Sequence, residues 1–130
     1  MHIILCSDSP AVRDVVYRSL ADPDDHLTVC ESGMELLATV KAIVSDLVIL
    51  DLESHGLGGL LLVSAVRELA PGLRILAVSM RSEVDARSLV QMGVPYVRLG
   101  ADGADGDEGG TRLLAEHLEG SGAALSTGSR

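Results

Sequence analysis

Two carboxylates in this sequence directly follow apolar segments of strand length. Asp51 ends the run Leu47–Leu50, where a buried strand does not normally carry a charge unless that charge is paired or bound to a cation. Asp8 comes shortly after another such run, residues 2–6. Neighbouring carboxylates raise each other's pKa unless they share a cation, and Mg²⁺ binds through a few oxygens plus waters. Asp8 and Asp51 therefore predict half of a site for a hard divalent cation.

A simpler interpretation of both residues stays open. Asp8 has the right position to cap a following helix, and Asp51 the right position to cap a turn. Spacing alone does not decide between these roles and a metal site. Ser79 also follows an apolar run, residues 74–78, and Arg98 and Leu99 follow the run 94–97. These residues are further candidates for the functional edge of the protein.

Five apolar runs must position these side chains. They cover residues 2–6, 26–30, 46–50, 74–78 and 94–97, and segments with helical spacing alternate with them at 12–20, 34–44, 60–69, 83–92 and 113–118. This β-α alternation predicts an α/β fold, a doubly wound five-stranded parallel sheet with helices on both faces. In such a sheet the functional crevice lies beyond the carboxyl ends of the strands, where Asp8, Asp51 and Ser79 fall.

Helix boundaries carry local signals. Asp8 or Ser9 can cap a helix that has Pro10 at an early position. Ser32 precedes the helical segment 34–44, and Ser82 precedes the segment 83–92. Gly93 stands where a left-handed helix terminator is expected.

The composition restricts the classes of function. A net charge of -9, from 19 acidic and 10 basic side chains, argues against direct binding of nucleic acid. No apolar run approaches the roughly 20 residues of a membrane span, so we expect a cytoplasmic protein without a membrane partner.

Cys6 and Cys30 are expected to be small buried hydrophobes rather than a disulfide. We expect one domain over residues 1–120 and a flexible tail or linker stub over 121–130.

Several quoted stretches together resemble a known family. IILCSDSPAVRDVV, CESGMELL and SDLVILDLESHGLGGLLLVSAVREL are similar to the receiver domains of two-component response regulators, over about residues 1–99. The coinciding features are Asp8 with Pro10, Asp51, the glycines at 56 and 59, and Ser79. The resemblance implies the flavodoxin-like strand order 2-1-3-4-5.

The resemblance also implies roles for individual residues. Asp51 would accept a phosphoryl group from a histidine kinase or phosphotransfer protein, and Ser79 would hydrogen-bond the phosphate. Weakly bound Mg²⁺ would be held by Asp8, Asp51 and the main-chain carbonyl of Glu53. Tyr96 matches the switch aromatic of the family. Such a domain is no enzyme beyond its own phosphorylation and dephosphorylation, and it signals to a downstream protein, or forms a homodimer, through the fourth helix, fifth strand and fifth helix.

The pattern departs from the family at two residues of the expected site, and the match also requires about two single-residue deletions, one before the fourth helix and one before the fifth strand. Ser7 replaces an acidic residue that holds the metal through water, and Leu99 replaces the lysine that binds the phosphate. Arg98 is adjacent, yet it would need a bulge or a twist to reach the site. A pseudo-receiver that binds proteins without phosphorylation is therefore the alternative. A flavodoxin-like electron carrier lacks its phosphate loop here, and the chain also fits the front part of a longer regulator.

Overall fold

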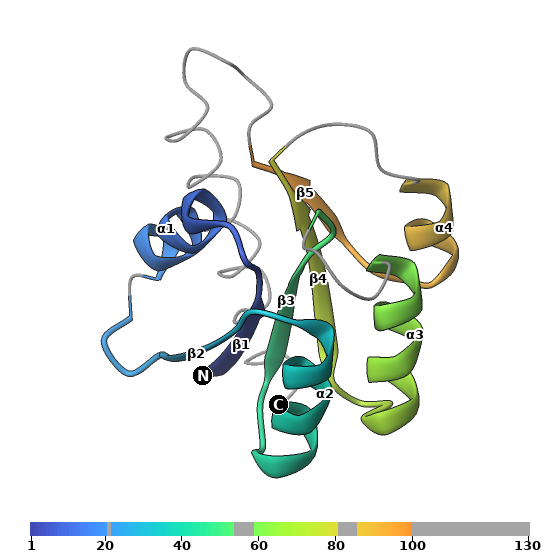
Figure 1. Cartoon of the computed structure of the whole chain (residues 1–130), viewed down its shortest axis with the longest axis horizontal. Coiled ribbons are helices and arrows are strands. Elements are labelled where there is room, and N and C mark those ends of the chain that lie inside the picture. The colour runs from blue at the N-terminus through green and yellow to red at the C-terminus, as the bar shows by residue number, and fades with distance from the viewer. Residues whose placement is uncertain (21, 54–58, 81–85, 100–130) are drawn as a thin grey trace, which may run out of the picture.

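A computed structural model of the chain describes residues 1–20, 22–53, 59–80 and 86–99 (Figure 1). Along the chain the elements are β1 (His2–Cys6), α1 (Pro10–Ser19), β2 (His26–Cys30), α2 (Gly33–Ala42), β3 (Leu47–Asp51), α3 (Gly59–Leu69), β4 (Arg74–Ser79), α4 (Ala86–Gln91) and β5 (Tyr96–Arg98). The strands form one sheet in the order β2-β1-β3-β4-β5, and every neighbouring pair is parallel. The predicted doubly wound sheet and its strand order are confirmed.

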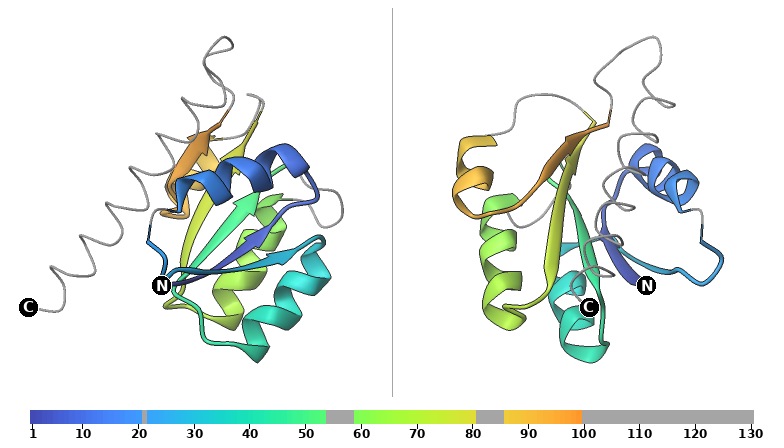
Figure 2. Two further views of the ribbon diagram at one scale, coloured as in Figure 1. Left: turned by 90° about the vertical axis from the view of Figure 1, so that its left-hand side faces the viewer. Right: turned by 180° about the vertical axis from the view of Figure 1, so that it is seen from behind.

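Helices cover both faces of the sheet (Figures 1 and 2). The pleat sends alternate side chains of each strand to opposite faces, so each face acquires its own apolar cluster. Ile3, Ile49 and Val78 belong to the cluster that α1 covers, whereas Ile4, Leu50 and the buried residues of α2, α3 and α4 form the other. Because helices cover both faces, the central strands consist almost entirely of apolar residues. The buried carboxylate of Asp51, at the end of β3, is an exception to this pattern.

The helix ends follow the local signals in the sequence. Ser9, rather than Asp8, caps α1, since its hydroxyl accepts a hydrogen bond from the backbone N–H of Val12. The interpretation of Asp8 as this cap is therefore wrong. Ser32 caps α2 in the same way, and Gly93 follows α4 with a φ of 70°, a conformation that glycine adopts without strain.

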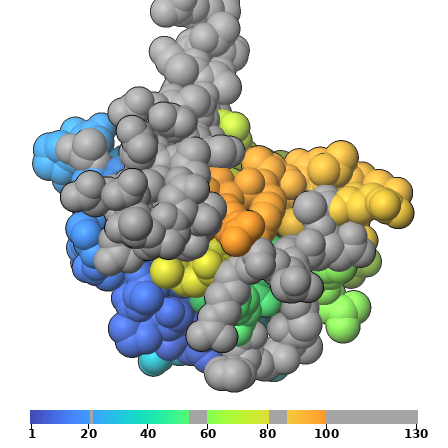
Figure 3. Space-filling view, turned by 90° about the horizontal axis from the view of Figure 1, so that it is seen from above, coloured from blue at the N-terminus to red at the C-terminus, as the bar shows by residue number. Residues whose placement is uncertain are grey.

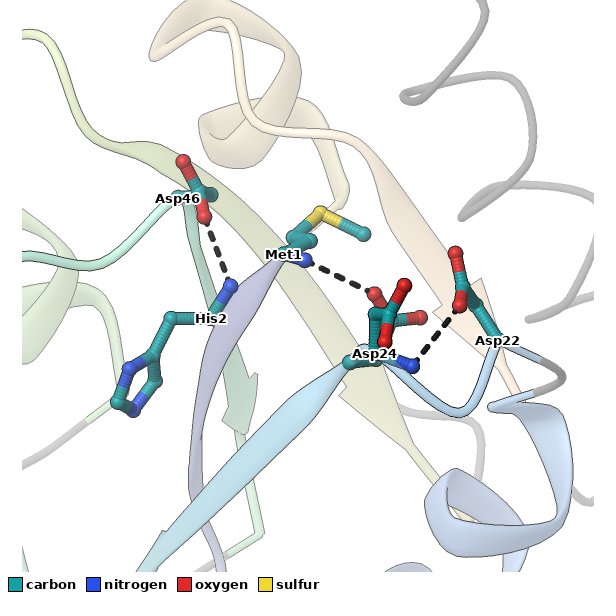
Figure 4. A network of polar contacts seen from close by, with 6 residues as sticks. Met1, His2, Asp22, Asp24 and Asp46 are labelled. Atoms are coloured by element: carbon teal, nitrogen blue, oxygen red, sulfur yellow. Dashed lines mark hydrogen bonds and ion pairs between the residues drawn. The ribbon is translucent and has the colours of Figure 1, made fainter.

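Polar contacts anchor the amino ends of the central strands (Figure 4). The backbone N–H of His2 donates to Oδ2 of Asp46 at 2.7 Å, and the Met1 ammonium donates to Oδ1 of Asp25 at 3.0 Å. Asp25 precedes β2 and Asp46 precedes β3, so these contacts tie the start of β1 to both neighbouring strands. The register of the three strands is thereby held from their amino ends.

Some boundaries differ from the sequence-based expectation. β3 includes Asp51 and β4 includes Ser79, so both residues lie at the last position of a strand rather than after it. β5 begins two residues later than expected, at Tyr96, and α2 ends at Ala42. Ser82, the fifth helical segment and the division at residue 120 lie outside the described residues.

Two expectations concern burial and the membrane. Cys6 and Cys30 are buried and form no disulfide, as expected for small apolar core residues. None of the helices in the described ranges has the length and hydropathy that crossing a bilayer requires.

Candidate functional site

Strand register gathers the candidate residues at the carboxyl edge of the sheet. Cys6 pairs with Leu50, which places Ser7 beside Asp51. Asp51 itself pairs with Val78 of β4, so Ser79 lies one residue further along the neighbouring strand. Figure 3 looks onto this edge, with the blue surface of the β1–α1 segment on one side and the orange and gold surface of β5 and α4 on the other. The arrangement is the one expected for a crevice in an open parallel sheet.

Asp51 is a buried carboxylate held by two hydrogen bonds. Only 3% of the residue is exposed to solvent. The hydroxyl of Ser7 donates to its Oδ2 atom at 2.6 Å, and the backbone N–H of Glu53 donates to its Oδ1 atom at 2.9 Å. The second contact is a turn cap, so that interpretation of Asp51 is correct. It does not compete with a chemical role, because the same contact orients the carboxylate.

Burial raises the pKa of the Asp51 carboxyl group above its ordinary range. The hydrogen bonds from Ser7 and from the Glu53 backbone act in the opposite direction, and the negative charges of Glu53 and Asp8 raise the pKa further. Within residues 1–20, 22–53, 59–80 and 86–99, no lysine or arginine forms an ion pair with Asp51. The site therefore concentrates negative charge at a poorly hydrated position.

The donor set of this edge suits a hard divalent cation. Asp8 lies half-buried between β1 and α1, close enough for its charge to act on Asp51. Carboxylate and carbonyl oxygens are ligands of Mg²⁺, which takes one or two carboxylates and keeps several waters. Across the described part of the chain, no group of three acidic, histidine or cysteine side chains converges on a metal position. Asp8 and Asp51 are the carboxylates at this edge that could hold Mg²⁺, and the main-chain carbonyl of Glu53 is the third oxygen expected from the sequence.

Ser79 is fully buried and bonds a different carboxylate. Its Oγ donates to Oε1 of Glu53 at 2.6 Å. The backbone carbonyl of Ser79 accepts a hydrogen bond from the N–H of Leu99 at 2.7 Å, which continues the β4–β5 ladder. The structure thus brings Ser79 to the edge of the site, with its hydroxyl directed to Glu53.

Sequence reasoning missed two side chains of this site. From the sequence, Ser7 is expected only to replace an acidic residue, yet its buried hydroxyl donates to Asp51 and also accepts from the backbone N–H of Ser9 at 3.1 Å. Glu53 is expected to act through its main-chain carbonyl, whereas in the structure its carboxylate accepts a hydrogen bond from Ser79. A signal for Ser7 is present in the sequence, because Ser7 directly follows β1 just as Asp51 follows Leu50 in the neighbouring strand β3. Spacing contains no signal for the contact of Glu53.

Tyr96 and Arg98 lie in β5, and Leu99 directly follows this strand. Tyr96 opens the strand opposite Ala77 and packs, half-buried, against the cluster on the α2–α4 face. Arg98 pairs with Ser79 in a ladder that continues without a bulge, and its side chain is exposed. Leu99 is fully buried in the cluster under α1. Leu99, expected from the resemblance to replace a lysine, thus contributes an apolar side chain to the core.

A model of one protein family matches most of the described chain, and similar proteins agree with it. The response regulator receiver domain matches residues 3–97. The DNA-binding transcriptional regulator NtrC of Salmonella typhimurium is 29% identical over 79 residues, which span 61% of this chain and only 17% of NtrC.

Solved structures show the same fold. The response regulator domain of Thermotoga maritima CheB has a TM-score of 0.74 at 18% identity, covering 97% of this chain and 96% of that one. The response regulator TrrA of the same organism, solved in complex with Mg²⁺ and BeF, has a TM-score of 0.71 at 22% identity, covering 92% and 97%. With the family match over residues 3–97, this chain belongs to the response regulator receiver domain family of two-component signalling.

Proposed function

We propose that Asp51 accepts a phosphoryl group from a histidine kinase or phosphotransfer protein. The observation that carries this proposal is the buried Asp51 carboxylate at the end of β3, with each oxygen held by one hydrogen bond. Phosphoryl transfer requires mainly positioning and neutralisation of charge, and a carboxylate is an adequate nucleophile. The bond from phosphorus to the donor histidine nitrogen breaks, and a bond from phosphorus to an Asp51 oxygen forms.

The surrounding residues have distinct tasks in this proposal. Ser7 and the Glu53 backbone N–H orient the Asp51 carboxylate before transfer. Asp8, Asp51 and the Glu53 carbonyl would hold Mg²⁺, which neutralises the charge of the incoming phosphoryl group when bound. Ser79 supplies its hydroxyl to a phosphoryl oxygen, and Tyr96 of β5 acts as the switch aromatic.

The output of the domain is a change in protein binding. We assign the signalling surface to α4, β5 and the fifth helical segment, where a downstream protein or a second copy would bind. Residues 1–120 form a cytoplasmic receiver domain in this proposal, with no catalysis beyond its own phosphorylation and dephosphorylation. Support for the metal comes from TrrA, which was solved in complex with Mg²⁺ and BeF.

The experiment is to incubate the full chain with Mg²⁺ and acetyl phosphate and to record its intact mass. A parallel sample with a beryllofluoride phosphate mimic is followed by backbone NMR. Wild type should gain one phosphoryl group and show Mg²⁺-dependent shifts around Asp51 and Ser79. Asp51→Asn should show neither change, because it removes the nucleophilic oxygen.

A matched control is Asp14→Asn, which removes the same charge from an exposed position of α1. It should behave as wild type in both measurements. A folded wild-type protein that responds to neither reagent would refute the phosphoacceptor role of Asp51. Binding of proteins without phosphorylation would then be the remaining function.

A further inference from the structure

Glu53 contacts both chemical groups of the site. Its backbone N–H donates to Oδ1 of Asp51 at 2.9 Å, while its carboxylate accepts the hydroxyl hydrogen of Ser79 at 2.6 Å. Ser79 is fully buried, so water competes poorly for its hydroxyl. One short segment, the two residues after β3, thus links the phosphate acceptor to the hydroxyl expected to bind the phosphate.

We propose that the Glu53 carboxylate is a built-in competitor of the phosphoryl group for the Ser79 hydroxyl. In the unmodified domain Glu53 holds this hydroxyl, and phosphorylation of Asp51 requires Glu53 to release it. The inference rests on the proposed function of Asp51. A serine hydroxyl has a single hydrogen to donate, so a bond to Glu53 excludes a bond from the same hydroxyl to a phosphoryl oxygen.

Electrostatics acts in the same direction. The negative charge of Glu53 acts on the Asp51 carboxylate, so it opposes further negative charge at that place. A phosphoryl group brings between about one and two further negative charges to the same place. Leu99, fully buried, offers no charge at the position where the family resemblance leads one to expect a lysine. Glu53 therefore lowers the stability of the phosphorylated form both by occupying Ser79 and by repulsion.

The test is an NMR titration of the full chain with beryllofluoride at saturating Mg²⁺. Glu53→Ala should bind the mimic about fivefold more tightly than wild type, the effect of removing one competing hydrogen bond of roughly 1 kcal/mol. Glu53→Gln removes the charge but keeps an acceptor for Ser79, so its gain should be smaller. Glu68→Gln changes the same charge at an exposed position of α3 and should leave the affinity unchanged.

Dependence on Ser79 separates competition from simple repulsion. In a Ser79→Ala background the hydroxyl is absent, so Glu53→Ala should change the affinity much less than it does in wild type. An equal gain in both backgrounds would overturn the proposal, because Glu53 would then act through its charge alone. No gain from Glu53→Ala over Glu68→Gln, with wild type binding normally, would overturn it while leaving the proposed function intact.

Spectra without the mimic test the contact itself. Leu99 donates its N–H to the Ser79 carbonyl, so the amide of Leu99 and the side-chain carbons of Ser79 report on this corner. Both sets of shifts should move in Glu53→Ala and stay in Glu68→Gln. Unmoved shifts would refute the Glu53–Ser79 contact whether or not any variant binds the mimic. Absence of binding in every variant would instead refute the proposed function, and with it the competition.

Discussion

Replacing Ser7 with alanine removes the hydroxyl that donates to Oδ2 of Asp51 at 2.6 Å. Ser7 is fully buried and Asp51 is 3% exposed, so water cannot easily replace the lost donor. A hydrogen bond to a charged group contributes about 1.5–3 kcal/mol, and the backbone N–H of Ser9 loses its acceptor as well. We expect Ser7→Ala to lower the free energy of unfolding at neutral pH by about 2–3 kcal/mol.

The loss should depend on pH in a defined direction. Burial raises the pKa of Asp51, and the hydrogen bond from Ser7 opposes that rise. Without Ser7 the pKa of Asp51 in the folded protein is higher still. Between the two folded pKa values, the folded variant therefore binds a proton that folded wild type does not. Relative to wild type, the variant therefore loses stability as the pH rises through the interval between the two folded pKa values. The difference is fully present above that interval and shrinks below it.

Urea denaturation followed by circular dichroism, from about pH 4.5 to about pH 8, measures this difference. Ser19→Ala is the matched control, because Ser19 is also buried but its hydroxyl donates to the neutral carbonyl of Val15 at 2.7 Å. It should cost about 1 kcal/mol without this pH dependence. In an Asp51→Asn background, Ser7→Ala should cost much less than in wild type. An equal cost in both backgrounds, or a cost independent of pH, would refute the reasoning.

Three further outcomes follow from the buried residues of the site and the core. Burial raises the pKa of Asp51 above 3.8, so wild type loses stability as the pH rises from 3.8 to the pKa of Asp51 in the folded protein. Asp51→Asn should lack this loss and should be more stable than wild type at pH 7 in urea titrations. Leu99→Ala should lower the free energy of unfolding by about 2–4 kcal/mol in the same assay, whereas Val90→Ala, at a side chain 74% exposed, should change it by less than about 0.5 kcal/mol. Burial raises the pKa of the Cys6 thiol to about 12, so the native protein should resist a thiol reagent at pH 8 and react only when unfolded; rapid labelling of native Cys6 would contradict this.

Local chemistry accounts for the parts of the fold that the sequence predicts well. Hydrophobic periodicity identifies the five strands, and the capping side chains of Ser9 and Ser32 mark the starts of α1 and α2 where the structure has them. Gly93 ends α4 because a positive φ favours glycine. The alternation of strands and helices then predicts the doubly wound sheet, and Asp51 is placed at its carboxyl edge.

Contacts between distant residues depend on the tertiary structure. Ser7 meets Asp51 across 44 residues and Ser79 meets Glu53 across 26, and both contacts require the register of β1, β3 and β4. The choice of Ser9 over Asp8 as the cap of α1 likewise depends on backbone geometry that composition does not show.

The sequence by itself determined which elements form, in what order, and which carboxylate ends the central strand, because these follow from patterns within a few residues. Only the tertiary structure decided which donors hold Asp51, that the Ser79 hydroxyl bonds Glu53, and that Leu99 is buried in the core. A side chain's partner depends on strand register, side-chain direction and the exclusion of water, and these arise only when the sheet and its helices pack together.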